Sequence, residues 1–205
     1  MNKRTILKFV TTFTSIICLI ALSSCANDAY RELASDPEPA VSKGNSVSKS
    51  DRNAYRKALT ALNNNDLDEA QRLFNQFIRN KPKLAGGYSN LALIHLQKNE
   101  LDKSLEQVNK ALELNPDQTQ ALNIRGQLNI KQGKIDEAKK DYLKAVKIKP
   151  NYIHAQYNLA LLYDVYLQEI ALAIKHYKIY LSLIKKPDTM TQDWVIHLEG
   201  TLKNG

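Results

Sequence analysis

Cysteine, glycine and proline are scarce in this sequence. Its 205 residues include two cysteines, seven glycines and six prolines. Both cysteines, Cys18 and Cys25, stand in the first 25 residues, so the rest of the chain can form no disulfide. Most of the glycines and prolines stand between helical patterns, which is where an all-helical protein places them.

Motifs of catalysis and metal binding are also missing. The sequence has no glycine-rich phosphate loop, no nucleophile elbow and no HExxH pair. The histidines are scattered, with no second ligand at metal spacing: His95, His154, His176 and His197. Acids recur where second helices are expected to begin, and there they favour the helix dipole: Asp68, Glu69, Asp102, Asp136 and Glu137. We predict no enzyme activity, no cofactor and no metal.

The charge is basic but dispersed. Lysine and arginine number 29 against 21 acids, a net charge of +8. Lys3, Arg4 and Lys8 belong to a segment that we expect to be removed, and the other basic residues alternate with acids along helix faces. Since nucleic-acid binding needs a concentrated basic stripe beside aromatics or a known motif, we predict no nucleic-acid partner.

The stretch from Ala58 to Pro150 repeats at a step of 34 residues. Prolines stand at this step: Pro82, Pro116 and Pro150. Small residues share it: Ala58, Ala92, Gly126 and Ala160. So do apolar residues: Leu67, Leu101 and Ile135. A step of this length is typical of stacked helical hairpins, each too small to bury its own apolar face.

Helical periodicity predicts four hairpins over residues 51–186 and a capping helix with a tail over 187–205. The predicted pairs are 51–63 with 67–80, 87–98 with 101–114, 119–131 with 135–148, and 153–166 with 170–184. Asn65, Asn99 and Gly133 stand at the turns, where a left-handed backbone is favoured. The fourth hairpin needs one extra residue near 167–168, so an irregular turn is expected there. The capping helix carries apolar residues at helical spacing: Trp194, Val195, Leu198 and Leu202.

The small residues of the first helices should meet small residues of their partner helices, with Gly126 facing Ala138. The facing column is Ala70, Ser104, Ala138 and Ala173. Larger side chains are expected behind this contact: Phe74, Val108, Tyr142 and Tyr177.

These columns resemble the tetratricopeptide repeat (TPR). The resemblance implies an all-α solenoid whose first helices line a concave groove for a protein or peptide. The implied groove residues are Tyr55, Leu59, Leu62, Ser89, Asn90, Leu93, Gln97, Asn123, Gln127, Lys131, Tyr157, Asn158 and Leu161. Asn90 and Asn158 match the asparagine that often bonds a bound peptide's backbone in this family. A mixed amide and aliphatic groove suggests an extended or helical apolar ligand.

One subclass of the family, which binds chaperone tails, clamps a terminal carboxylate with basic residues. The corresponding positions here are Tyr55, Leu59, Asn123 and Gln127. None of the four is basic, so that subclass is rejected.

Residues 1–24 read as a secretory signal peptide. A basic start is followed by an apolar stretch, 9–22, that is too short to span a bilayer comfortably. The ending Leu22-Ser23-Ser24-Cys25 resembles the lipobox of bacterial lipoproteins, which implies a lipidated Cys25 and attachment to a membrane. The alternative is an uncleaved membrane anchor with an incidental cysteine. The residue after the cysteine is Ala26 rather than aspartate, so in a cell with two membranes the resemblance implies the periplasmic face of the outer membrane.

Residues 25–50 are expected to be the lipidated cysteine followed by a flexible tether. The stretch contains Pro37, Pro39 and Gly44 and has no helical or strand periodicity. As a flexible coil, about 25 residues reach about 25–30 Å.

Anchor, tether and repeats together predict a scaffold that helps to assemble a machine of the cell envelope. The layout resembles that of TPR lipoproteins that support pilus and secretin assembly. The alternative is an adaptor that docks cell-wall hydrolases or proteases at the outer membrane, and an enzyme is the third candidate.

Overall fold

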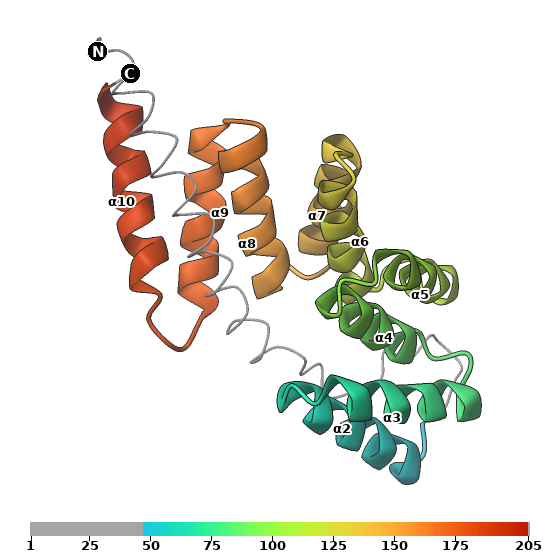
Figure 1. Ribbon diagram of the computed structural model, residues 1–205. Helices are drawn as coiled ribbons and strands as arrows, with labels where there is room; N and C mark the ends of the chain where they lie inside the picture. The colour runs from blue at the N-terminus through green and yellow to red at the C-terminus, as the bar shows by residue number, and fades with distance from the viewer. Residues whose placement is uncertain (1–46, 205) are drawn as a thin grey trace, which may run out of the picture.

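The structure is a computed structural model in which residues 47–204 are described, and it consists of α-helices with one π-helical turn. The helices pair into hairpins that follow one another along a curved stack, with α10 at one end (Figure 1). The elements are α2 (Lys49–Asn63), α3 (Leu67–Asn80), α4 (Ala85–Gln97), α5 (Leu101–Leu114), α6 (Thr119–Lys131), α7 (Ile135–Ile148), α8 (Ile153–Leu161), η1 (Leu162–Tyr166), α9 (Ile170–Leu183) and α10 (Thr189–Asn204). The predicted all-α solenoid of four hairpins and a capping helix is confirmed.

Four helices, α3, α5, α6 and α7, begin and end at the predicted residues. The first helix begins earlier than predicted, at Lys49. Ser48 explains this start, because its hydroxyl accepts from the Asp51 N–H while the Asp51 carboxylate accepts from the Ser48 N–H. Lys81 and Ser48 lower the pKa of Asp51 to about 2. The predicted signal peptide, Cys25 and residues 26–46 of the predicted tether lie outside the described residues.

The fourth hairpin is irregular, as expected, but the extra residue is accommodated ahead of the turn. The backbone N–H of Leu167 donates to the carbonyl of Leu162 at 3.1 Å, an i→i−5 bond that closes the π-helical turn η1. Gln168 then takes the left-handed position that Asn65, Asn99 and Gly133 occupy in the other turns, with φ of 55°.

The contact between paired helices corrects one expectation. Ser104 donates to the carbonyl of Ala92 at 2.8 Å, so these columns meet as predicted. The space beside Gly126, however, is taken by the ring of Tyr142 one turn beyond Ala138. Tyr142 is 2% exposed. Gly126 therefore admits an aromatic ring as well as a close helix.

The core runs along the stack rather than around one centre, in two clusters. One joins α2 to the repeats that follow, with Tyr55 packed edge-on against Phe74 at 5.6 Å between ring centroids. The other joins α7, α8, α9 and α10, and includes Tyr157 and Tyr177. Such a core is typical of solenoids, in which each repeat contacts its neighbours.

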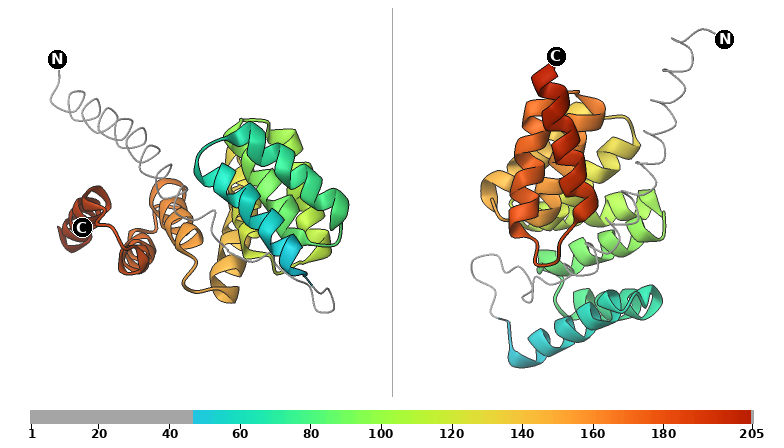
Figure 2. Two further views of the ribbon diagram at one scale, coloured as in Figure 1. Left: turned by 90° about the horizontal axis from the view of Figure 1, so that it is seen from below. Right: turned by 90° about the vertical axis from the view of Figure 1, so that its left-hand side faces the viewer.

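The last helix, α10, packs along α9, and both views of Figure 2 show the two helices side by side. Val195 and Leu198 are each 5% exposed, and the indole N–H of Trp194 donates to Asp164 at 2.7 Å. Leu202 is 52% exposed. The capping prediction is thus confirmed for three of its four apolar residues and is wrong for Leu202, which lies beyond the covered part of the hairpin.

Candidate functional site: the face of the first helices

The first helices of successive repeats contact one another. α4 contacts α6 and α6 contacts α8, while each second helix also contacts the first helix that follows it. α4, α6 and α8 therefore follow one another along one side of the curved stack (Figure 1), and the bond from Asn90 to Tyr55 joins α2 to α4. This side, called the inner face below, contains the residues that the sequence assigned to a groove.

The structure places these residues at three depths. Eight are buried: Tyr55, Leu59, Leu62, Ser89, Asn90, Leu93, Asn123 and Tyr157. Gln127, Asn158 and Leu161 are half-buried, and Gln97 and Lys131 are exposed. Direct contact with a partner is open mainly to these last five side chains. Their role in binding stays a prediction.

Asn90 is fully engaged within the protein. Its amide nitrogen donates to the hydroxyl of Tyr55 at 2.7 Å and to the carbonyl of Gly86 at 2.8 Å. Its amide oxygen accepts from Gln120 at 3.0 Å. An asparagine can make few further bonds once these are formed, so Asn90 joins α2, α4 and α6 instead of offering its amide to a peptide.

Asn158 makes an equivalent bond two hairpins further along the chain. Its amide nitrogen donates to the side-chain oxygen of Asn123 at 2.9 Å, across the same 35-residue separation that joins Asn90 to Tyr55. Between the two links, Gln118 donates to the hydroxyl of Ser89 at 3.2 Å. These bonds form an amide ladder across the first helices, and each of its buried polar groups is thereby satisfied.

Gln127 differs from the other inner-face amides. Its Nε2 atom is buried and has no hydrogen-bond partner among residues 47–204. A buried donor without an acceptor is unfavourable. Gln127 as a whole is half-buried, so its side chain has to turn outward before a carbonyl oxygen of a bound chain can accept from this donor. With that turn, Gln127 is an amide candidate for contact with a partner.

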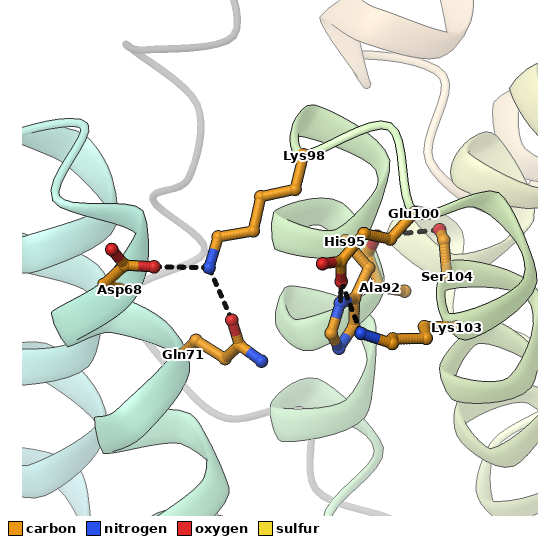
Figure 3. A network of polar contacts seen from close by, with 8 residues as sticks. All are labelled: Asp68, Gln71, Ala92, His95, Lys98, Glu100, Lys103 and Ser104. Atoms are coloured by element: carbon orange, nitrogen blue, oxygen red, sulfur yellow. Dashed lines mark hydrogen bonds and ion pairs between the residues drawn. The ribbon is translucent and has the colours of Figure 1, made fainter.

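A polar network lies between α3 and α4 and around the turn from α4 to α5 (Figure 3). Lys98 reaches from the end of α4 to Asp68 and Gln71 of α3, at 2.6 Å each. The Nδ1–H of His95 donates to Glu100 at 2.6 Å, and this bond, together with Lys103, lowers the pKa of Glu100. The contacts of Lys98 hold the first two hairpins together, and those of Glu100 lie within the second hairpin.

An ion pair between a half-buried arginine and a buried aspartate was missed by sequence reasoning. Arg125 donates to Asp141 at 2.9 and 2.5 Å, and Asn129 adds a third bond at 3.1 Å. The bond to Asp141 raises the pKa of Arg125, and Asp141 is 6% exposed. A signal was present, because Arg125 stands at the repeat position of Leu91 and Leu159, where a charge needs an inward partner.

The described residues offer little other chemistry. No cluster of three or more His, Cys, Asp or Glu residues suited to a metal occurs within 47–204. None of the helices described is long and apolar enough to cross a membrane. Burial lowers the pKa of His154 and of His176 to about 4, so both imidazoles are neutral near pH 7.

Comparisons with known proteins identify the repeats. A tetratricopeptide repeat family model matches residues 55–119, and a TPR repeat model matches residues 126–164. Comparison with curated proteins finds no match.

Solved structures of low identity share the fold. Pseudomonas aeruginosa PilF is similar with a TM-score of 0.63 and 18% identity, over 75% of this chain and 70% of that one. Yeast Tom70 is similar with a TM-score of 0.60 and 21% identity, over 72% and 32%. A chain of the Naa15/Naa10 complex bound to HypK-THB has a TM-score of 0.58 and 20% identity, over 76% and 24%.

Proposed function

On the premise that this chain belongs to the tetratricopeptide repeat family, we propose that it is a protein–protein interaction scaffold of the cell envelope, which helps to assemble a machine of the pilus or secretion type. The scaffold role follows from the repeats. The envelope and the machine are the further step of the proposal.

One observation supports the scaffold role: on the inner face, accessible side chains stand over a layer of buried, hydrogen-bonded residues. The amide ladder holds the first helices in place. Above it, Gln97, Gln127, Lys131 and Leu161 remain at least partly accessible, and the buried Gln127 Nε2 lacks an acceptor among residues 47–204. A preorganised surface binds without the cost of ordering its own side chains. The similar chain of the Naa15/Naa10 complex comes from a structure with HypK-THB bound, which accords with this role.

The envelope location rests on the N-terminal sequence. Leu22-Ser23-Ser24-Cys25 has the form of a lipoprotein processing site, and Ala26 follows where aspartate would favour the inner membrane. Acylation of Cys25 would hold the repeats within a tether's length of the outer membrane. Cys25→Ser should therefore abolish labelling by palmitate and release the protein from the membrane fraction. Unchanged labelling in this variant would remove the basis for the location.

Photo-crosslinking in cells tests the scaffold role. A photoreactive residue at Gln127 or Leu161 should capture a specific partner, because both positions lie on the inner face. Gln76, an exposed residue of α3, is the matched control. Capture of a pilin, a secretin or another machine component supports the proposal. Capture of a cell-wall hydrolase or protease supports the adaptor alternative, and equal capture from Gln76 contradicts an inner-face site.

A further inference from the structure

The outer sides of the second helices carry charges in two columns at the repeat step, and α5 reverses both. One column is Arg72, Glu106, Lys140 and Lys175. The other is Arg79, Glu113, Lys147 and Ser182. In the fourth repeat the step includes the extra residue of η1. All eight side chains are exposed. The second repeat is thus the one that presents acids where its neighbours present bases or, once, a serine.

On α5 the acids form a continuous stripe beside a hollow. Asp102, Glu106, Asn109 and Glu113 follow one another at helical spacing and are all exposed. The hollow, of about 450 Å³, is lined by Tyr88, Glu106, Gln107, Asn109, Lys110 and Glu113. The exposed carboxylates of Glu106 and Glu113, which line this hollow, suit an incoming ammonium group.

On α7 the same positions are basic and apolar. Lys140, Leu143 and Lys147 repeat the spacing of Glu106, Asn109 and Glu113, and Leu143 is 39% exposed. The exposed acids of α7 are confined to its first turn. Within residues 47–204, neither Lys140 nor Lys147 has an ion pair. Glu106 likewise has none, whereas Glu113 pairs with Lys110 at 2.9 Å.

We propose that the occupant of this surface is a second copy of the chain, with α5 of each copy against α7 of the other. α5 and α7 belong to neighbouring repeats, so a two-fold axis beside this pair can set α5 of one copy against α7 of the other. Each contact then occurs twice, as symmetric dimers require. Lys140 meets Glu106 and Lys147 meets Glu113. Both ion pairs can form at once, because the two lysines are seven residues apart and so are the two glutamates.

Charge favours a second copy over an anionic membrane. A membrane would attract Lys140, Lys147 and Lys175, but it would repel the carboxylates of Glu106 and Glu113 between the basic repeats. A second copy matches both signs. The contact joins two outer, convex sides and relies on exposed charges, so the dimer is weak and sensitive to salt.

Charge reversal and its repair test the proposal on the full chain in non-ionic detergent, by sedimentation velocity over a concentration series. The wild type should form a dimer that dissociates as salt rises. Lys140→Glu with Lys147→Glu, or Glu106→Lys with Glu113→Lys, should each weaken dimerisation about tenfold or more, because attractive pairs become repulsive. All four changes together should restore the dimer. The control, Arg79→Glu with Lys175→Glu, alters the same columns in the outer repeats and should leave the dimer intact.

Several outcomes would overturn the proposal. A wild type that stays monomeric at every concentration, a fourfold variant that fails to recover, or a control that weakens the dimer equally would each exclude this surface. Binding of the wild type to phosphatidylglycerol vesicles that requires Lys140 and Lys147, without self-association, would assign the lysines to a membrane. Far-ultraviolet circular dichroism checks each fold, and glutamine at the same positions replaces any reversed pair that does not fold.

Discussion

Gly126 determines how closely α6 and α7 pack, so its replacement by alanine should destabilise the third repeat. An ideal Cβ at position 126 would lie 2.8 Å from both Cδ1 and Cζ of Tyr142. Carbon atoms in contact are normally about 3.5–4.0 Å apart. The Tyr142 ring is 2% exposed and has no open space to enter. We expect the overpacking to cost roughly 1–3 kcal/mol.

Gly200 provides the matched control. It also lies inside a helix, α10, but no atom stands within 4 Å of the Cβ that alanine would add. Gly200→Ala should therefore stabilise the protein by up to about 1 kcal/mol through helix propensity alone. Because propensity acts equally at both sites, the difference between the two variants isolates the overpacking of roughly 1–3 kcal/mol. Urea unfolding followed by circular dichroism at 222 nm measures both free energies.

A compensating change sharpens the test. The second repeat already pairs Ala92 with Val108 at these positions, and both residues are fully buried. Tyr142→Val alone should destabilise the protein by leaving a cavity. Combined with Gly126→Ala, it should cost less than the sum of the two single changes, since the valine leaves room for the new methyl group. Equal stability of Gly126→Ala and Gly200→Ala, or strict additivity in the double variant, would refute the contact with Tyr142.

Three further predictions concern pH, turns and the inner face. Because burial lowers the pKa of His154 and His176 to about 4, the unfolded chain binds protons first, and unfolding free energy should fall as pH drops from about 6.5 to 4. The fall should be shallower in His176→Gln, as urea unfolding at pH 7 and 4.5 would show. Gln168 and Gly133 both have left-handed backbones, which favour glycine. Gln168→Gly should therefore raise the free energy of unfolding by about 1 kcal/mol and Gly133→Ala should lower it by about as much, and melting temperatures should shift in the same directions. Asn90→Ala with Asn158→Ala should destabilise the protein by about 0.5–1.5 kcal/mol per lost bond, and an unchanged denaturation midpoint would show that the ladder does not support the fold.

The fold could be predicted because its information is local and repeated. Proline, small-residue and turn columns recur at one step, so each confirms the others, and α5, α6 and α7 have the predicted bounds. The extra residue of the fourth hairpin was also readable, because Ala173 and Tyr177 realign only after a one-residue shift. Its location was not readable. Either a longer loop or a π-helical turn absorbs one residue, and sequence spacing is the same for both.

How deeply each residue of the inner face is buried could not be predicted from sequence alone. Periodicity assigns a residue to a side of its helix, but burial depends on how far the next repeat rotates over it. Asn90 was expected to face a partner, yet Tyr55 and Gln120 from two neighbouring repeats close over its amide. The earlier start of α2 was within reach, since Ser48 and Asp51 have the spacing of a capping box.

Burial of the ladder changes which residues can determine partner specificity. A ligand that used the Asn90 amide would first have to break bonds to Tyr55 and Gly86, and it would leave those groups to be satisfied anew. A ligand that used Gln127 would satisfy a buried donor that has no acceptor in residues 47–204. The second contact loses nothing within the protein. Recognition should therefore concentrate on α6 and α8, around Gln127 and Leu161, while the ladder of α2 and α4 maintains the curvature that presents them.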